Sequence, residues 1–364
     1  MNFEKDKKAI RMKTIDGNHG DDEFKRKNTQ KVLNQVNSLR KTYAQKWSEY
    51  NQAKTSEKIV ALRLLSELIE NFEIEKNKCN GRPLIPLKEQ MICMFLYTYS
   101  RFSSRRVISD LELARQNKLI DKTPHFNTVC NFFKKDEMTS ILSQLVEITA
   151  MPLRLVEEKI IVDSSGFSTS LYERWFDIRT QAVSRKRKWK KVHLSCGAKT
   201  HCITSVRITP GNYGDSPELV PLIKNTAKHF DMKEISADKA YLSRNNLNFI
   251  GEHGAIPFIP FKSNSLKNSR GSRLWKQMWL FFYNNQEEFM KHYHARSNIE
   301  TTFSMLKRIY GNFLRLRDET GQINEILMKC LCHNLAVLVQ EGFELGIEID
   351  FKKCAELYFA QVED

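Results

Sequence analysis

Several features that would narrow the class of protein are missing from this 364-residue sequence. No apolar run approaches the roughly 18 consecutive residues that a membrane-spanning helix needs. The N-terminus begins with closely spaced Glu, Lys and Asp residues and lacks the apolar core of a signal peptide. We therefore expect a cytoplasmic protein with no membrane partner.

Cysteine is sparse and scattered, with eight residues in the whole chain. The only close pair, Cys330 and Cys332 beside His333, lies in an apolar helical run and has no second half-site that could complete a zinc site. We expect reduced cysteines in the core, and neither zinc ligands nor disulfides.

Acidic residues are too few to balance the basic ones. The chain has 58 Lys and Arg against 43 Asp and Glu, which gives a formal net charge of +15. An excess of this size indicates a polyanionic partner, most often nucleic acid. Charge alone does not identify which polyanion binds.

The pattern of apolar residues divides the chain into segments. Residues 1–30 are highly charged, have almost no apolar periodicity and are predicted to form a mobile arm. Residues 31–152 show helical spacing of apolar residues, and residues 153–345 alternate short β-rich runs with helices. Within residues 153–345, about 262–288 reads as a moderate insertion. Residues 346–364 then read as a C-terminal tail helix.

One segment of the helical region has the features of a DNA-reading helix. Thr123–Lys135 begins with polar residues, has an apolar flank and ends on two lysines. It could be the recognition helix of a helix-turn-helix, whose N-terminal residues contact bases. An ordinary amphipathic helix of a bundle explains the pattern equally well, because this motif has no rigid sequence signature.

Two aspartates follow short segments that predict strands, the first of them an apolar run suited to a buried strand. Asp163 follows residues 159–162, and Asp238 follows residues 234–237. Carboxylates at the ends of strands face crevices, and the two positions are equivalent in this pattern. Asp163 and Asp238 are therefore predicted to share one site.

Two other aspartates in this region have simpler explanations. Residues 191–195 and 202–209 predict an antiparallel strand pair. Asp215 then precedes a predicted helix start, with Ser216 as the cap and a proline at the first helical position. Asp177 falls in a charged loop. We exclude both from the predicted site.

A long segment without Gly or Pro begins inside the predicted insertion and continues beyond it, so a helix is permitted from Ser272 to Tyr310. At roughly 100° per residue, four polar side chains fall inside a stripe about 60° wide. They are Tyr293, Arg296, Glu300 and Lys307. Their neighbouring stripe is apolar and suited to packing on a sheet. A solvated face with charged pairs is the simpler alternative for the polar stripe.

Two strand-end aspartates and a helical glutamate are the ligands that a two-metal phosphoryl-transfer site requires. Asp163, Asp238 and Glu300 offer hard oxygen ligands, which suit Mg²⁺ or Mn²⁺. Two such ions can stabilise both the attacking and the leaving oxygen at phosphorus. The residue types therefore predict a metal-dependent reaction on a phosphodiester.

The spacing of the polar stripe supports this interpretation. Two residues separate the Tyr from the Arg, three separate the Arg from the Glu, and six separate the Glu from the Lys. This spacing resembles the Tyr-Arg-Glu-Lys signature of DDE transposases from bacterial and archaeal insertion sequences, in the branch that includes groups four and five. Asp238 and Tyr241 match the Asp-x-x-Tyr pattern of the same family, with Ala240 where a Gly is common. The segment 262–288 is too short for the long β-insertion of some relatives.

The resemblance implies a fold, a reaction and roles for these residues. It implies an α/β protein with a ribonuclease-H-like catalytic domain, a mixed sheet flanked by helices, after an all-helical DNA-binding region. Asp163, Asp238 and Glu300 would be the catalytic and metal-binding triad, with two Mg²⁺ or Mn²⁺ ions. Tyr293 and its two basic companions in the signature, Arg296 and Lys307, would contact DNA.

The implied activity is transposition. Such an enzyme binds terminal inverted repeats, hydrolyses a phosphodiester and joins the freed 3′-OH to target DNA, as a homodimer that pairs two ends near the nucleoid. Two alternatives remain open: a two-metal DNA nuclease of the same fold without strand transfer, and a domesticated DNA-binding protein.

A dense run of basic residues precedes the antiparallel strand pair. It consists of Arg185, Lys186, Arg187, Lys188, Lys190 and Lys191, with Trp189 among them. These cations could follow a phosphate backbone while the indole stacks on a base. A solvated loop is the alternative. We predict DNA contacts for the six basic residues.

Overall fold

The computed structural model describes residues 46–72, 84–169, 189–268 and 271–360. The predicted arm, the first part of the helical region, Asp177 and the basic positions 185–188 lie outside these ranges. The predicted segment boundaries remain predictions.

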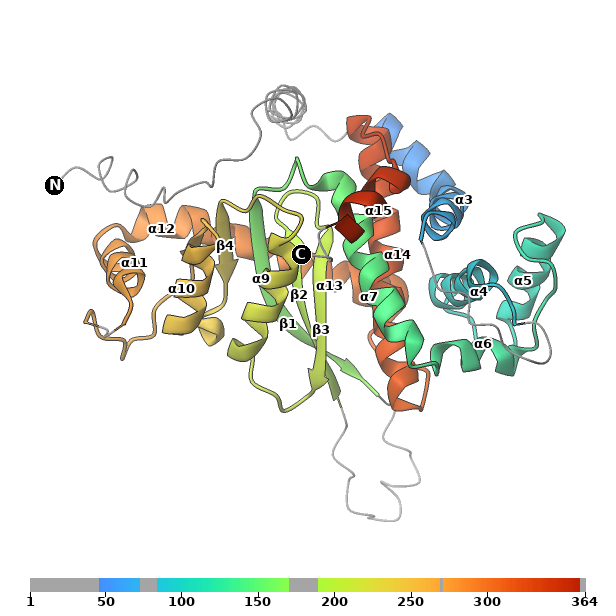
Figure 1. Ribbon diagram of the computed structural model, residues 1–364, viewed down its shortest axis with the longest axis horizontal. Helices are drawn as coiled ribbons and strands as arrows, with labels where there is room; N and C mark the ends of the chain where they lie inside the picture. The colour runs from blue at the N-terminus through green and yellow to red at the C-terminus, as the bar shows by residue number, and fades with distance from the viewer. Residues whose placement is uncertain (1–45, 73–83, 170–188, 269–270, 361–364) are drawn as a thin grey trace, which may run out of the picture.

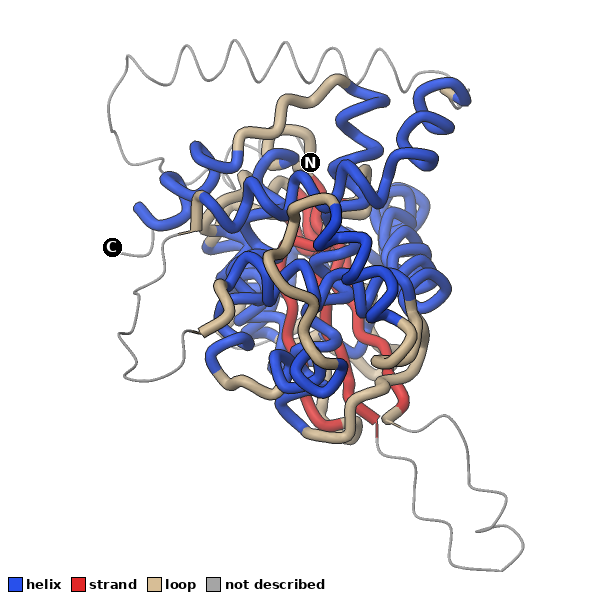
Figure 2. Tube along the Cα trace, turned by 90° about the vertical axis from the view of Figure 1, so that its right-hand side faces the viewer, coloured by secondary structure: helices blue, strands red, loops and turns tan. Residues whose placement is uncertain are grey.

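A five-stranded mixed sheet lies at the centre of the described chain. Its strands are β1 (Lys159–Ser168), β2 (Trp189–Gly197), β3 (Ile203–Pro210), β4 (Glu234–Ala237) and β5 (Ile256–Phe258), in the order β3-β2-β1-β4-β5. The first three pair antiparallel, whereas β4 runs parallel to both β1 and β5. Helices lie on both sides of the strands (Figure 2). The mixed sheet flanked by helices confirms the predicted class of fold.

The burial of β1 agrees with its central place in the sheet. Ile160, Ile161 and Val162 are consecutive and all fully buried, as expected of a strand covered on both faces. The predicted antiparallel pair is present as β2 and β3, and β2 begins at Trp189, inside the basic run.

The helical region precedes the sheet. It comprises α3 (Trp47–Glu70), α4 (Leu87–Ser100), α5 (Val107–Gln116), α6 (Phe126–Phe133), α7 (Glu137–Ala150) and η1 (Met151–Leu153). Between and after the strands come η2 (Ser216–Glu218), α9 (Leu219–Ala227), η3 (Lys239–Tyr241), α10 (Arg244–Glu252), α11 (Arg273–Asn284), α12 (Gln286–Tyr293), η4 (His294–Arg296), α13 (Ser297–Tyr310), α14 (Glu319–Leu345) and α15 (Phe351–Ala360). Figure 1 shows α4, α5 and α6 on the far side of α14 from the sheet.

Helix α14 joins the two parts of the molecule. It packs against α3, α4, α6 and α7, and also against β3 and α13. A window in this helix is long and apolar enough to cross a membrane, contrary to our expectation that no such run exists, but 83% of that window is buried inside the protein. A helix that is apolar on most sides is the expected core of a protein of this size. Its Cys330 and Cys332 are buried in the core, as predicted.

The prediction of one long helix from Ser272 to Tyr310 is wrong. The segment divides into α11, α12, η4 and α13, with a break at Asn285 and a 3₁₀ turn before α13. Lack of Gly and Pro permits a helix but does not straighten it. Phe289 of α12 is fully buried against Phe258 of β5, at 5.4 Å between ring centroids, so tertiary packing sets the bend.

Candidate active site

The pairing of β1 with β4 places the two predicted aspartates side by side. Val162 and Ala237 are the last residues paired in this parallel ladder, so Asp163 and Asp238 both follow directly after it. We predicted Asp163 at the end of its strand, and this is wrong, because β1 continues to Ser168 along β2. The end of the β1–β4 pairing, rather than the end of β1, creates the site.

Each aspartate is oriented by the backbone that follows it. The amide of Ser164 donates to Asp163 Oδ1 at 2.8 Å, and the amide of Lys239 donates to Asp238 Oδ1 at 2.7 Å. Asp238 thereby caps η3, the turn that leads to Tyr241. Both carboxylates keep their second oxygen for other partners.

Arg296 links the sheet to the helix that carries the glutamate. Its Nη2 lies 2.6 Å from Asp163 Oδ2, and its Nη1 lies 2.8 Å from Glu300 Oε1. The side chain of Asp163 is 15% exposed, whereas that of Glu300 is 63% exposed. The guanidinium thus supplies the positive charge between a strand carboxylate and a helix carboxylate. In the described ranges, no three His, Cys, Asp or Glu side chains are yet arranged to hold one ion.

The electrostatic balance at Asp163 indicates a site for positive charge. Burial raises the pKa of Asp163, and the nearby charge of Asp238 acts in the same direction, while the Ser164 amide and Arg296 lower it. A largely buried carboxylate beside a second carboxylate is stabilised by a nearby cation.

Lys307 and Tyr293 complete the predicted stripe near β1. Lys307 Nζ donates to Ser165 Oγ at 2.6 Å and lies 5.3 Å from the centroid of the Phe167 ring. Burial lowers the pKa of Lys307. Burial also raises the pKa of Tyr293, while the nearby charge of Arg296 lowers it. The structure therefore brings the signature residues of the bent segment to one strand, although no single straight helix carries them.

Asp215, which we excluded on sequence, belongs to this neighbourhood. Ser164 Oγ donates to Asp215 Oδ1 at 2.7 Å, and Lys191 Nζ lies 2.7 Å from the same oxygen. His193 Nδ1 is 3.5 Å from it. Asp215 precedes η2 but makes no side-chain capping bond. Its carboxylate instead lies beside the residue that follows Asp163.

The predicted cap at Ser216 is also wrong. The Oγ and carbonyl of Ser216 both accept from Asn246 Nδ2, at 3.1 and 2.9 Å. The register of the three strands, which the local sequence does not reveal, brings Asp215 to the site. Because Lys191 pairs with Thr209 and also with Gly166, the end of β3 lies near the end of β1.

The two described lysines of the basic run have carboxylate partners. Lys190 forms an ion pair with Glu319 of α14, and Lys191 pairs with Asp215. Both ammonium groups are mostly covered by protein. Their contact with DNA remains a prediction, as does that of the four cations outside the described ranges.

If Asp163 holds a metal ion, as the family resemblance implies, Asp215→Asn is expected to reduce DNA cleavage by about 10- to 100-fold, because groups that hold metal ligands in place typically contribute that much to metal affinity or activity. The reason is that Asp215 fixes Ser164, whose amide orients Asp163. The measurement is the cleavage rate over a Mg²⁺ titration, with the exposed Asp231→Asn as the matched control. An unchanged Mg²⁺ dependence in Asp215→Asn contradicts this role.

Comparison with known proteins places the chain in a family. Residues 154–335 match the transposase DDE domain family, so the chain belongs to it. The cryo-EM structure of a piggyBac transposase synaptic complex with hairpin DNA is similar over 83% of this chain and 79% of that chain, with 12% sequence identity and a TM-score of 0.37. The fold is a ribonuclease-H-like DDE domain after an N-terminal helical region. Such a domain implies polynucleotidyl transferase activity, and DDE transposases typically use divalent metal ions.

Proposed function

We propose that the protein is an insertion-sequence transposase of the branch with the Tyr-Arg-Glu-Lys signature. It binds the terminal inverted repeats of its element, hydrolyses a phosphodiester to free a 3′-OH and directs that hydroxyl at target DNA. The observation that carries the proposal is the Arg296 bridge. It places Glu300 of α13 beside Asp163, at the end of the β1–β4 pairing where Asp238 also lies.

The donor set suits hard divalent ions. Asp163, Asp238 and Glu300 would hold Mg²⁺ or Mn²⁺, since carboxylate oxygens are the preferred ligands of both. A pair of ions at such a site activates the attacking oxygen and stabilises the leaving oxygen. Arg296 now compensates two of the three carboxylates, so it keeps Glu300 next to the strand until a cation shares that charge.

The remaining signature residues fit phosphate contacts. Arg offers a planar fork to phosphate oxygens, and Lys offers a point charge. Arg296 and Lys307 approach β1 at Asp163 and Ser165, two residues apart on one face of the strand. A DNA backbone lying along this face meets both cations and the half-buried ring of Tyr293.

The proposed partners are double-stranded DNA and a second copy of the chain. Coordinated movement requires both ends to be cut and joined at nearby target phosphates, and one triad offers one pair of metal sites. We therefore infer a homodimer in the complex that pairs the ends, acting in the cytoplasm at the nucleoid. Light scattering with and without end DNA tests this. A complex with one chain that still joins both ends contradicts it.

Incubation with labelled DNA from the regions that flank the gene separates the possible functions. A transposase is expected to cut at the element end, leave a 3′-OH and join it to added target duplex in Mg²⁺. Cleavage without joining identifies the nuclease alternative. Binding without cleavage identifies a domesticated DNA-binding protein. EDTA is expected to stop cleavage while binding persists, because the three carboxylates hold the ions and the basic residues hold the DNA.

A further inference from the structure

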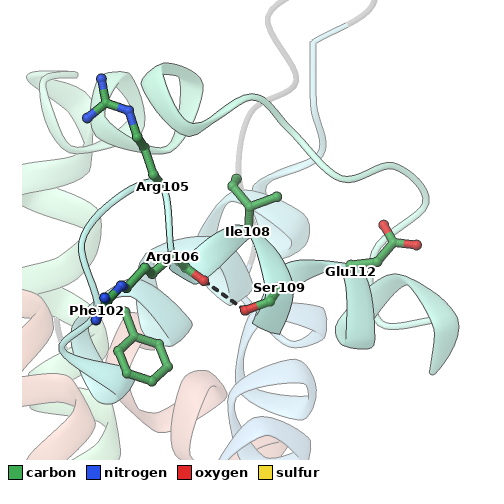
Figure 3. A pocket seen from close by; sticks show the side chains of 6 residues that line it. All are labelled: Phe102, Arg105, Arg106, Ile108, Ser109 and Glu112. Atoms are coloured by element: carbon green, nitrogen blue, oxygen red, sulfur yellow. Dashed lines mark hydrogen bonds between the residues drawn. The ribbon is translucent and has the colours of Figure 1, made fainter.

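An open hollow lies in the helical region, away from the triad. It has a volume of about 640 Å³ and is formed by the loop between α4 and α5 together with the first turns of α5. The residues that line it are Phe102, Arg105, Arg106, Ile108, Ser109 and Glu112. Figure 3 shows the two arginines toward one end of the hollow and Glu112 at the other.

The loop that forms this hollow is fastened to the catalytic domain. Arg315 donates to the carbonyls of Phe102 and Tyr97, at 2.5 and 2.8 Å. Arg101 Nη1 donates to the carbonyl of Arg308 on α13 at 3.1 Å. Arg308 is eight residues past Glu300, which is about 12 Å along a helix axis. The loop therefore lies at the far end of the helix that carries the proposed catalytic glutamate.

Backbone geometry also fixes the loop. Arg101 has a φ of 57°, a left-handed conformation that a residue other than glycine keeps only when its surroundings determine it. The hydroxyl of Ser109 donates to the carbonyl of Arg106 at 2.8 Å, and that of Ser103 accepts from the Arg106 amide at 3.4 Å. The arginines thus extend from a defined turn.

The charges of the hollow are divided between its ends. Arg105 and Arg106 are exposed, and within the described ranges neither guanidinium forms an ion pair with a carboxylate. Arg105 is held 4.7 Å from the centroid of the Phe126 ring. Glu112, at the other end, is engaged by Arg115 and by Thr123 Oγ1. One end therefore attracts anions, and the other carries a fixed negative charge.

The wall between these ends is apolar. Phe102 is 44% exposed, although its carbonyl is fixed by Arg315. Ile108 lies between the arginines and Glu112 in Figure 3. A strand of DNA presents phosphates alternating with sugars, so paired cations beside an apolar wall complement its backbone.

We propose that this hollow binds the backbone of double-stranded DNA, with phosphates on Arg105 and Arg106 and the intervening deoxyribose against Phe102 and Ile108. Glu112 repels further phosphates and so sets the direction in which the strand leaves. The inference rests on the proposed function, which supplies DNA as the partner. It assigns the DNA contact of the helical region to the α4–α5 loop.

This assignment differs from the predicted recognition helix. Helix α6 begins after His125, whose side chain accepts from the Asn127 amide, and Arg105 covers the ring of Phe126. The connection from α5 to α6 runs from residue 117 to 125, longer than the three- to four-residue turn of a helix-turn-helix. The start of α6 is engaged within the protein, whereas the arginines of the hollow face solvent.

The test is a salt titration of binding to a fluorescein-labelled DNA duplex of arbitrary sequence. Each lost phosphate contact reduces the slope of log K against log salt by about 0.9. The double variant R105Q/R106Q is expected to lose about 1.8 from the slope. The conservative R105K/R106K variant, which keeps both charges, is expected to retain it. The matched control R63Q/K224Q removes two exposed cations from α3 and α9 and is expected to change the slope little.

A slope in R105Q/R106Q equal to that of R63Q/K224Q overturns the proposed hollow while leaving DNA binding by the protein intact. A wild-type protein that does not bind the duplex overturns the proposed function itself, and the hollow with it. If the double variant has no thermal unfolding transition, R106Q alone carries the same test. Its expected loss is about 0.9, and no loss overturns the proposal.

Discussion

Asp163→Ala, Asp238→Ala and Glu300→Ala are each expected to reduce cleavage of end DNA by on the order of a thousandfold or more. Bound metal ions contribute several kcal/mol of transition-state stabilisation, and each 1.4 kcal/mol is a factor of ten in rate. The two aspartates lie together where the β1–β4 pairing ends, and Arg296 holds Glu300 beside them.

DNA binding is expected to persist in all three variants, because ligation of metal and docking of DNA use different side chains. Gel shift and cleavage assays on the same preparations separate the two properties. The exposed Asp231→Ala removes a carboxylate elsewhere and is expected to cleave normally. If one of the three alanine variants cleaves DNA at nearly the wild-type rate in Mg²⁺, the residue it replaces is not a member of the triad.

Lys329→Met is expected to lower the free energy of unfolding by about 3–5 kcal/mol, the usual cost of removing one partner of a buried ion pair. Lys329 is 1% exposed, and its Nζ lies 3.4 Å from Glu325 Oε1, itself fully buried. The ammonium also donates to the carbonyls of Gly311 and Phe313, at 3.2 and 2.8 Å. These carbonyls belong to the turn that follows α13, so the loss spreads from the core toward the helix of Glu300.

Denaturant unfolding measures this loss, and Lys352→Met, an exposed lysine of α15, serves as the control within about 0.5 kcal/mol of wild type. The double variant Glu325→Gln with Lys329→Met is expected to recover part of the stability, because it removes the buried carboxylate that Lys329→Met leaves with only the longer ion pair to Arg315, at 3.7 Å. A loss below about 1 kcal/mol in Lys329→Met means that the pair contributes little beyond its packing.

The sequence predicted the parts of the site that short-range patterns determine. A run of apolar residues identified β1, and the aspartates predicted to follow β1 and β4 both lie directly after the pairing of these two strands. The spacing of Arg296 and Glu300 correctly indicated side chains on one side of a helix, because four residues make nearly one turn.

The remaining features depend on contacts between distant segments. Burial of Phe289 against β5 bends the segment that was predicted to be one helix. Asp215 reaches Ser164 through the register of three strands, although its own neighbours read as a helix start. Neither contact leaves a periodic signal in the local sequence, so pattern analysis could not find it.

The position of α14 limits how this protein can be divided. The helix packs against α3, α4, α6 and α7 of the helical region and also against β3 and α13. A fragment that starts at residue 153 would retain α14 and lose four of the helices that cover it. The exposed apolar surface would then favour self-association. The helical region and the sheet therefore share one core through α14. A chimaera that took its helical region from one relative and its sheet from another would have to exchange α14 as well.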